Sequence, residues 1–168
     1  MPSRRFRGGA IARGWIGLAV AALVLLFDQL SKSWALEALQ QPPRMIEVTS
    51  FFNLVLVWNW GISFGILNRE SSLTPWLFVA LAGAVSIALI LWLRRIPRPF
   101  LALAVGLVLG GALGNLIDRL RFRAVIDFLD FHAGGYHWPT FNIADSAITI
   151  GILCLAVHSL LIPRKRLR

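Results

Sequence analysis

The fold of this chain is constrained most by four long apolar segments, at roughly residues 15–30, 73–93, 100–117 and 143–162. Each is bounded by charge or proline, and each is near the length of about 20 residues that a helix needs to cross a bilayer. Composition agrees, since 57% of the residues are hydrophobic and 15% are charged, unlike an ordinary soluble domain. The sequence predicts a mainly α-helical integral membrane protein, a single domain over residues 1–168 with four transmembrane helices.

The basic residues predict how the spans are oriented. With four spans, eleven of the seventeen Lys and Arg residues lie on one side and six on the other. Loops rich in Lys and Arg stay in the cytoplasm, so both termini are expected there. We interpret the net charge of +9 as this topology signal, because the basic residues lie in short tails and connections rather than on a surface for nucleic acid.

A fifth apolar stretch, residues 51–67, is the alternative to be weighed. As a span it would leave eight cations against nine and erase the charge bias. Its apolar residues alternate as in a strand, and Gly61 and Gly65 interrupt the second half of the stretch. We therefore expect a small β-rich element on the outer side, at about residues 44–68. Pro42 and Pro43 would separate it from a short amphipathic helix around residues 33–39.

The polar residues converge at the outer ends of these spans. Asp28 and Lys32 end the first span, Asn115, Asp118 and Arg119 end the third, Asn142 and Asp145 begin the fourth, and Asn59 and Asp127 lie in the outer connections. Carboxylates at this depth are unfavourable, and they usually mark function. Asp127 and Asp145 are thus the principal candidates for chemistry.

Several of these residues also have a simpler structural explanation. Asp28 and Lys32 are four apart and can form an ion pair on one helix face, although Lys32 could instead activate Ser31 or Ser146. Asn142 and Asp145 suit an N-cap with an acid in the first turn. Asp127, however, has no helix of its own to cap. Its neighbour Asp130 is expected to be solvated.

Two further features do not predict a ligand. Gly106, Gly110 and Gly114 recur every four residues and predict close packing of the third span against another helix. His132 and His137 lie near Asp127 and Asp130, but they lack the spacing of a zinc site. We expect no metal and no cofactor.

Five stretches together resemble the bacterial signal peptidase II family, the lipoprotein signal peptidases. They are FDQLSK at 27–32, NWGISFG at 59–65, GGALGNLIDR at 110–119, VIDF at 125–128 and FNIADSA at 141–147. They occur in the expected order and cover most of the chain. The combination is specific, although no single stretch is.

The resemblance implies an aspartyl endopeptidase of the bacterial cytoplasmic membrane, with Asp127 and Asp145 as the catalytic pair at the outer face. The substrate would be a prolipoprotein carrying a diacylglyceryl group on its lipobox cysteine, cut on the amino side of that cysteine. Partners would be this precursor and membrane lipids, with no nucleic acid, and the enzyme would be a monomer. Residues implied to support the site or hold substrate are Asp28, Lys32, Asn59, Gly61, Asn115, Arg119 and Asn142, with Asp118 orienting Arg119.

Two other functions are compatible with parts of the pattern. Paired membrane acids also form ion relays, so the main alternative is a small ion or proton transporter. A relay needs polar residues through to both faces, whereas the cytoplasmic halves of these spans are almost wholly apolar. A scaffold without chemistry would need only the glycine strip, and it leaves the clustered Asp, Asn and Arg unexplained.

Overall fold

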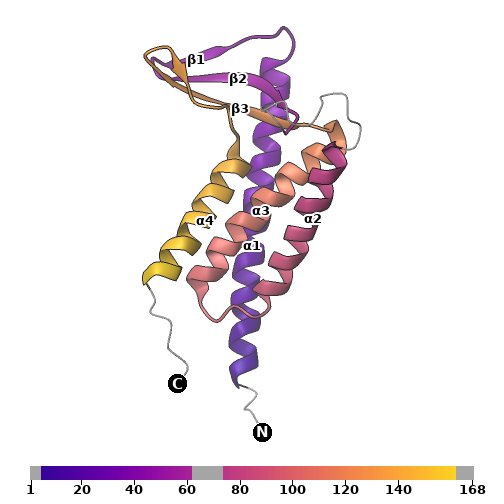
Figure 1. Ribbon diagram of the computed structural model, residues 1–168, viewed down its shortest axis with the longest axis vertical. Coiled ribbons are helices and arrows are strands. Elements are labelled where there is room, and N and C mark those ends of the chain that lie inside the picture. Colours follow the sequence, from indigo (N-terminus) through magenta and orange to yellow (C-terminus); the bar gives the residue numbers. More distant parts are fainter. Residues whose placement is uncertain (1–4, 62–73, 162–168) are drawn as a thin grey trace.

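The computed structural model describes residues 5–61 and 74–161, and within them four helices dominate (Figure 1). These are α1 (Arg5–Leu39), α2 (Thr74–Leu93), α3 (Pro99–Phe122) and α4 (Ile143–Leu161). All four are long and apolar enough to cross a membrane, over Gly14–Leu39, Pro75–Leu93, Pro99–Phe122 and Ile143–Leu161. The predicted fold class, four membrane helices with a small β-element, is confirmed.

Helix α3 is the centre of the bundle and packs against α1, α2 and α4. In its most apolar window 56% of the residues are buried, against 11–17% in the other three helices. The glycines make this packing possible. A Cβ on Gly110 would lie 2.6 Å from the carbonyl oxygen of Ala21, and one on Gly106 would overlap the carbonyl oxygen of Gly17. The predicted close approach of a neighbouring helix is therefore confirmed, and that neighbour is α1.

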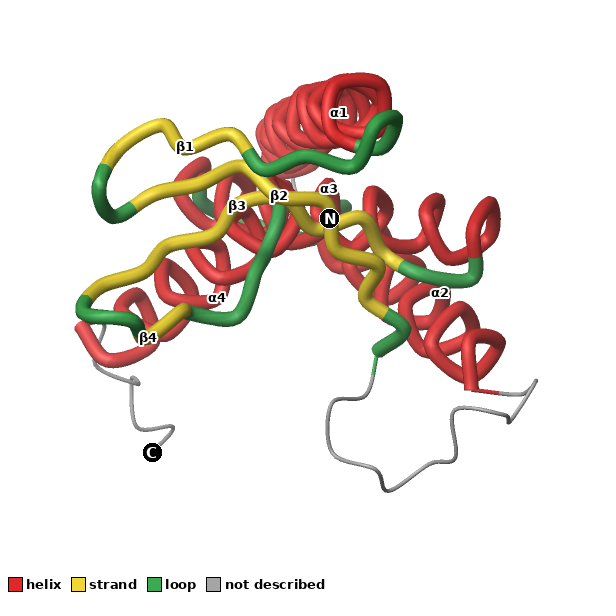
Figure 2. Tube along the Cα trace, turned by 90° about the horizontal axis from the view of Figure 1, so that it is seen from above, coloured by secondary structure: helices red, strands yellow, loops and turns green. Residues whose placement is uncertain are grey.

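A four-stranded antiparallel sheet lies across one end of the bundle, and α1 begins and α4 ends at the opposite end (Figures 1 and 2). Its strands are β1 (Ile46–Thr49), β2 (Phe52–Asn59), β3 (Val125–Ala133) and β4 (Tyr136–His137), in the order β1-β2-β3-β4. The expected β-element thus appears at residues 46–59, and residues 62–68 of it lie outside the described part. The strand formed by residues 52–59 also excludes the fifth-span alternative for that stretch.

Half of the sheet comes from a segment for which the sequence predicted no structure. Strands β3 and β4 belong to the connection between α3 and α4, and β3 pairs with β2 so that Asp127 stands opposite Val57. The first four residues of β3 are all buried. Because both faces of this strand are covered, it lacks the apolar–polar alternation by which a half-exposed strand is recognised.

Helix α1 continues without a break to Leu39, so the prediction of a separate short helix at residues 33–39 is wrong. Lys32, Ala35 and Leu39 occupy one helical face and are 2%, 0% and 1% exposed. Ala35 and Leu39 pack with Phe128 of β3 in an apolar cluster. Burial under the sheet therefore keeps this part of α1 helical and continuous with the span, and the prolines act only after residue 39.

Candidate active site

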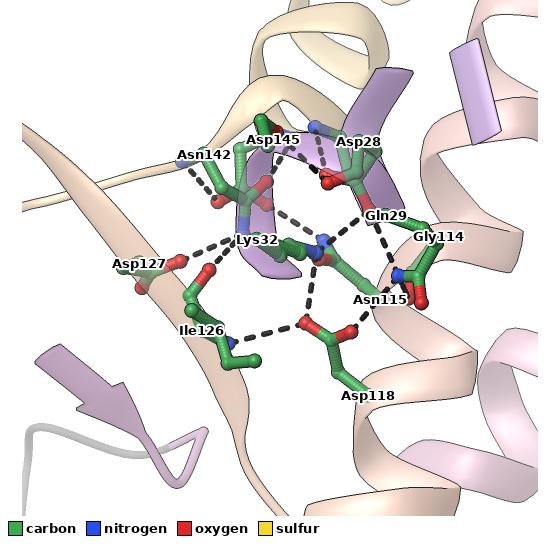
Figure 3. A network of polar contacts seen from close by, with 12 residues as sticks. Asp28, Gln29, Lys32, Gly114, Asn115, Asp118, Ile126, Asp127, Asn142 and Asp145 are labelled. Carbon is green, nitrogen blue, oxygen red and sulfur yellow. Dashed lines mark hydrogen bonds and ion pairs between the residues drawn. The ribbon is translucent and has the colours of Figure 1, made fainter. Parts of the chain in front are cut away.

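All ten residues predicted to form or support the site belong to one polar network at the sheet end of the bundle. Figure 3 shows the part of this network around Lys32. They come from α1, α3, β2 with the turn after it, β3, and α4 with the residue that caps it. Residues about 117 positions apart in the chain are thus brought together, as between Asp28 and Asp145. Local packing of each residue on its own element does not explain such a network.

Asp127 stands on β3 and is 1% exposed. One carboxylate oxygen, Oδ1, accepts a hydrogen bond from Asn142 Nδ2 at 2.7 Å, and the other, Oδ2, accepts one from Asn59 Nδ2 at 2.8 Å. Burial raises the pKa of Asp127 to about 7; the hydrogen bond from Asn59 opposes this shift and the negative charge of Asp145 adds to it. Asp127 therefore holds a proton at a pH where an ordinary aspartate is ionised.

Asp145 lies in the first turn of α4 and is half-buried. Its Oδ1 accepts a hydrogen bond from Asn115 Nδ2 at 2.8 Å, and its Oδ2 accepts one from the backbone N–H of Asn142 at 3.3 Å. Its own N–H donates to Asn142 Oδ1 at 2.9 Å. The N-cap interpretation is therefore confirmed. The same capping asparagine also reaches Asp127, so Asn142 contacts both members of the predicted pair.

Lys32 is the centre of the network. Its ammonium lies 2.8 Å from Asp28 Oδ2 and 2.8 Å from Asp118 Oδ2, and it donates to Asn115 Oδ1 at 3.0 Å. The three N–H donors of a lysine thus meet three acceptors. The side chains of Lys32, Asp28 and Asp118 are only 0–2% exposed. This one cation therefore compensates two buried carboxylates and ties α1 to α3.

Each carboxylate paired with Lys32 also holds the backbone just before one of the two candidate aspartates. Asp28 Oδ1 accepts the N–H of Ala144 at 2.9 Å, the residue before Asp145. Asp118 Oδ2 accepts the N–H of Ile126 at 3.1 Å, the residue before Asp127. The Lys32 cluster, meaning Lys32, Asp28 and Asp118, therefore fixes where both aspartates enter the site.

Gln29 completes this arrangement, and the sequence did not single it out. Its amide donates to Asp118 Oδ1 at 3.0 Å, to Asp28 Oδ2 at 3.2 Å and to the carbonyl of Gly114 at 3.3 Å. The sequence feature that could have identified Gln29 is its position in the same helical turn as Asp28 and Lys32. A glutamine beside an ion pair in an apolar helix is itself unfavourable unless it is hydrogen-bonded.

Two predictions about individual acids are corrected. Asp118 was expected to orient Arg119, but its ion pair and hydrogen bonds go to Lys32, Ile126 and Gln29, and only its charge acts on Arg119. The guanidinium of Arg119 donates to the carbonyl of Asn115 at 3.3 Å and lies 5.2 Å from the ring centroid of Phe78.

Asp130 was expected to be solvated, yet it is 4% exposed. It accepts hydrogen bonds from Asn53, its partner across the β2–β3 ladder, at 3.2 Å and from His137 at 2.9 Å. The imidazoles of His132 and His137 stack with centroids 4.9 Å apart. This group is separate from the network around Lys32, and no metal-binding cluster occurs among the described residues.

The serine–lysine alternative is not supported by the geometry. Ser31 Oγ donates to the carbonyl of Asp28 at 2.8 Å, and Ser146 Oγ donates to the carbonyl of Asn142 at 3.0 Å. The ammonium of Lys32 is engaged with its two acids and Asn115. Neither serine is placed for activation by Lys32.

Known proteins match this chain over most of its length. A family model described as signal peptidase (SPase) II matches residues 20–161. A lipoprotein signal peptidase of Oleidesulfovibrio alaskensis is 47% identical over 150 residues, covering 87% of this chain and 96% of that protein. One of Burkholderia vietnamiensis is 48% identical over 153 residues, covering 90% of each.

Two solved structures share the fold. Both are bacterial membrane enzymes determined by the in meso method, at 2.3 and 1.9 Å resolution. They match with TM-scores of 0.72 and 0.75 at 30% and 31% identity. The matches cover 90% and 88% of this chain and 94% of each solved chain.

The Lys32 cluster yields a prediction about stability. Lys32→Met leaves two buried carboxylates without their cation, and it should lower the free energy of unfolding by about 3–5 kcal/mol. Arg94→Met removes an exposed cation and should change the free energy of unfolding by less than about 0.5 kcal/mol. Thermal unfolding of the purified proteins in detergent measures both. Equal melting temperatures for the parent and Lys32→Met would contradict the central role of this cation.

Proposed function

The chain belongs to the signal peptidase II family, and from that premise we propose that it removes signal peptides from prolipoproteins with Asp127 and Asp145 as its catalytic pair. Membership makes it a hydrolase and a multi-pass bacterial membrane protein. The observation that best supports the aspartyl mechanism is Asn142, whose side chain and backbone hydrogen-bond both carboxylates. The comparisons give no support to the ion-transporter alternative.

In the proposed mechanism the two carboxylates share one proton. Close like charges in a poorly hydrated site resist ionising together, and the pKa of Asp127, raised by burial to about 7, makes it the member that more readily holds the proton. The titration still belongs to the pair. One carboxyl is therefore available as an acid while the other acts as a base.

Cleavage then proceeds in two steps. The ionised carboxylate takes a proton from water, the water oxygen bonds to the scissile carbonyl carbon, and the protonated carboxyl donates to the carbonyl oxygen. As the carbon–nitrogen bond breaks, the protonated base gives its proton to the leaving amine nitrogen, and the other carboxylate takes a proton back from a hydroxyl of the tetrahedral intermediate, which collapses to the carboxylic acid product. Both carboxyl groups end with one proton between them, ready for the next substrate.

Arg119 is the best donor for the oxyanion. The side-chain N–H groups of Asn59, Asn115 and Asn142 are already directed at the two carboxylates. Arg119 is partly exposed, and the hydrogen bond described for its guanidinium uses one of five N–H donors. A single well-placed donor of this kind lowers the barrier by roughly 3 kcal/mol.

The position of the site suits a substrate that stays in the bilayer. We place the sheet end of the bundle at the outer face, with both termini cytoplasmic, because eleven of the seventeen cations then lie inside. A diacylglyceryl group resists transfer to water by about 0.8 kcal/mol per methylene, so the enzyme must act where the lipid ends. We further propose that the chain is one domain and works as a monomer.

The exposed aromatic residues of the sheet fit this placement. Tyr136 is 69% and Trp138 is 61% exposed, and they lie at the end of β3 opposite to Asn59. Such rings are typical of the headgroup level. We propose that they anchor the sheet at the membrane surface.

Replacing either aspartate tests the proposal. Asp127→Asn and Asp145→Asn should each lower kcat by roughly 10²- to 10⁴-fold, because the shared proton can no longer be exchanged. Asp130→Asn, a change of the same kind on the same strand, should keep near-parental activity. Cleavage of lipidated and unlipidated precursor by purified enzyme in detergent is the assay. If either catalytic variant cleaves lipidated precursor as fast as Asp130→Asn, the assignment fails.

The pH profile gives a second test. Activity should fall as pH rises through about 7, where the pair loses its proton. The hydrogen bond from Asn59 stabilises ionised Asp127 and so lowers its pKa. Asn59→Ala removes this bond and should therefore move the high-pH limb of the pH–activity profile, where activity falls, to higher pH. The other groups that affect Asp127, namely Asp145, Asn142 and Lys32, stay in place. A limb that is unmoved, or moves to lower pH, would show that Asn59 does not act on the proton.

A further inference from the structure

Helix α2 contains no charged residue, yet one of its side chains contacts the site. This is Phe78, near the sheet end of α2, where α2 packs beside α3. The guanidinium of Arg119 lies 5.2 Å from the centroid of its ring. Gly61 lies against the edge of the same ring, because a Cβ built there would be 2.7 Å from Phe78 Cε2. Gly61 has a φ of 96°, so both its backbone and the ring disfavour a side chain at this position.

The ring contacts Gly61 and Arg119. Hydrogen bonds link each of these two residues, through an asparagine, to one catalytic aspartate. On one side the N–H of Gly61 donates to Asn59 Oδ1 at 2.9 Å, and Asn59 Nδ2 donates to Asp127 at 2.8 Å. The bond from Gly61 therefore fixes the orientation of the Asn59 amide. In this orientation the amide nitrogen of Asn59, and not its oxygen, faces the Asp127 carboxylate.

The second chain runs through α3. Arg119 donates to the carbonyl of Asn115 at 3.3 Å, and Asn115 Nδ2 donates to Asp145 at 2.8 Å. The positive charge of Arg119 also interacts with the carboxylates of Asp145 and Asp127. The position of this guanidinium thus affects both members of the pair.

We propose that Phe78 is a positioning residue for the peptidase reaction, whose ring holds Gly61 and Arg119 so that Asn59 and Arg119 meet the catalytic pair correctly. The inference rests on the proposed roles of Asp127 and Asp145. An aromatic ring is needed because its face attracts the guanidinium of Arg119. The edge of the same ring packs against Gly61, which has no Cβ to keep the ring at a distance. An aliphatic side chain of similar size offers only the second contact.

The neighbouring residues of α2 make a matched comparison possible. Trp76 is 52% exposed and Leu77 is 60% exposed, so they face the lipid, as the apolar composition of α2 would lead one to expect. Phe78 is partly buried and turned toward Arg119. Replacing the aromatic residue of α2 by leucine should therefore lower kcat at position 78 and leave kcat unchanged at position 76.

The experiment compares Phe78→Leu, Phe78→Tyr and Trp76→Leu in the cleavage assay with lipidated precursor, with the parent and Asp127→Asn as references. Phe78→Leu should lower kcat by roughly three- to thirtyfold, the factor that a lost cation–π contact represents. Its high-pH limb should also move upward, because the bond from Asn59 that lowers the pKa of Asp127 is weakened. Lys32, Arg119 and Asp145, the charged groups around Asp127, keep their charges. Phe78→Tyr retains the ring and should restore rate and profile, and Trp76→Leu should match the parent.

Gly61→Ala disturbs the same contact from the other side, outside the helices, and keeps the test decisive if Phe78→Leu does not fold. It should move the limb in the same direction. The proposal is overturned if neither variant moves the limb, if Phe78→Tyr falls as far as Phe78→Leu, or if Trp76→Leu loses as much activity. These failures differ from failure of the proposed function, in which the parent does not cleave or Asp127→Asn still does.

Discussion

The ion pairs of Lys32 with Asp28 and Asp118 are the interaction on which the rest of the site depends. An unpaired charge at such burial is strongly unfavourable, so the three side chains must stay together. Because the two acids also accept the N–H groups of Ala144 and Ile126, the pairing extends from α1 and α3 to the start of α4 and to β3. One buried cation thus sets the relative positions of four elements, and two of these carry the proposed catalytic aspartates.

The glycines of α3 are part of the same arrangement. Gly114 faces Asp28, and Gly111 faces the backbone of Ala144, so closely that a Cβ at either position would overlap them. The sequence indicated only that a second helix could approach here. In the structure two helices do so, α1 on one side and α4 on another, and their approach lets an acid on α1 cap α4. Close packing of the helices and the geometry of the proposed catalytic site therefore have a common cause.

Much of this could be predicted from the sequence, for identifiable reasons. Span length predicted the four helices, and the charge bias argued against a fifth. The five motifs singled out the ten residues that the structure brings into one network. The features that the sequence did not predict depend on contacts between residues that are far apart in the chain. A sequence does not reveal which side chain accepts a given backbone N–H, so the bonds from Ile126 to Asp118 and from Ala144 to Asp28 could not be predicted. Asp118 was therefore assigned to its neighbour Arg119. Strand β3 is buried on both faces and lacks alternation, and Phe78 looks in the sequence like the lipid-facing Trp76.

The proposed mechanism depends on a carboxyl group that stays protonated near neutral pH beside an ionised partner, and infrared spectroscopy can observe this directly. A pH titration of the purified enzyme in detergent should show one protonated carboxyl band that disappears as pH rises through about 7. The band should be absent from Asp127→Asn. It should disappear at lower pH in Asp145→Asn, because the neighbouring negative charge is gone. If Asp127 proves fully ionised across the whole range in which the enzyme is active, the shared-proton mechanism is contradicted.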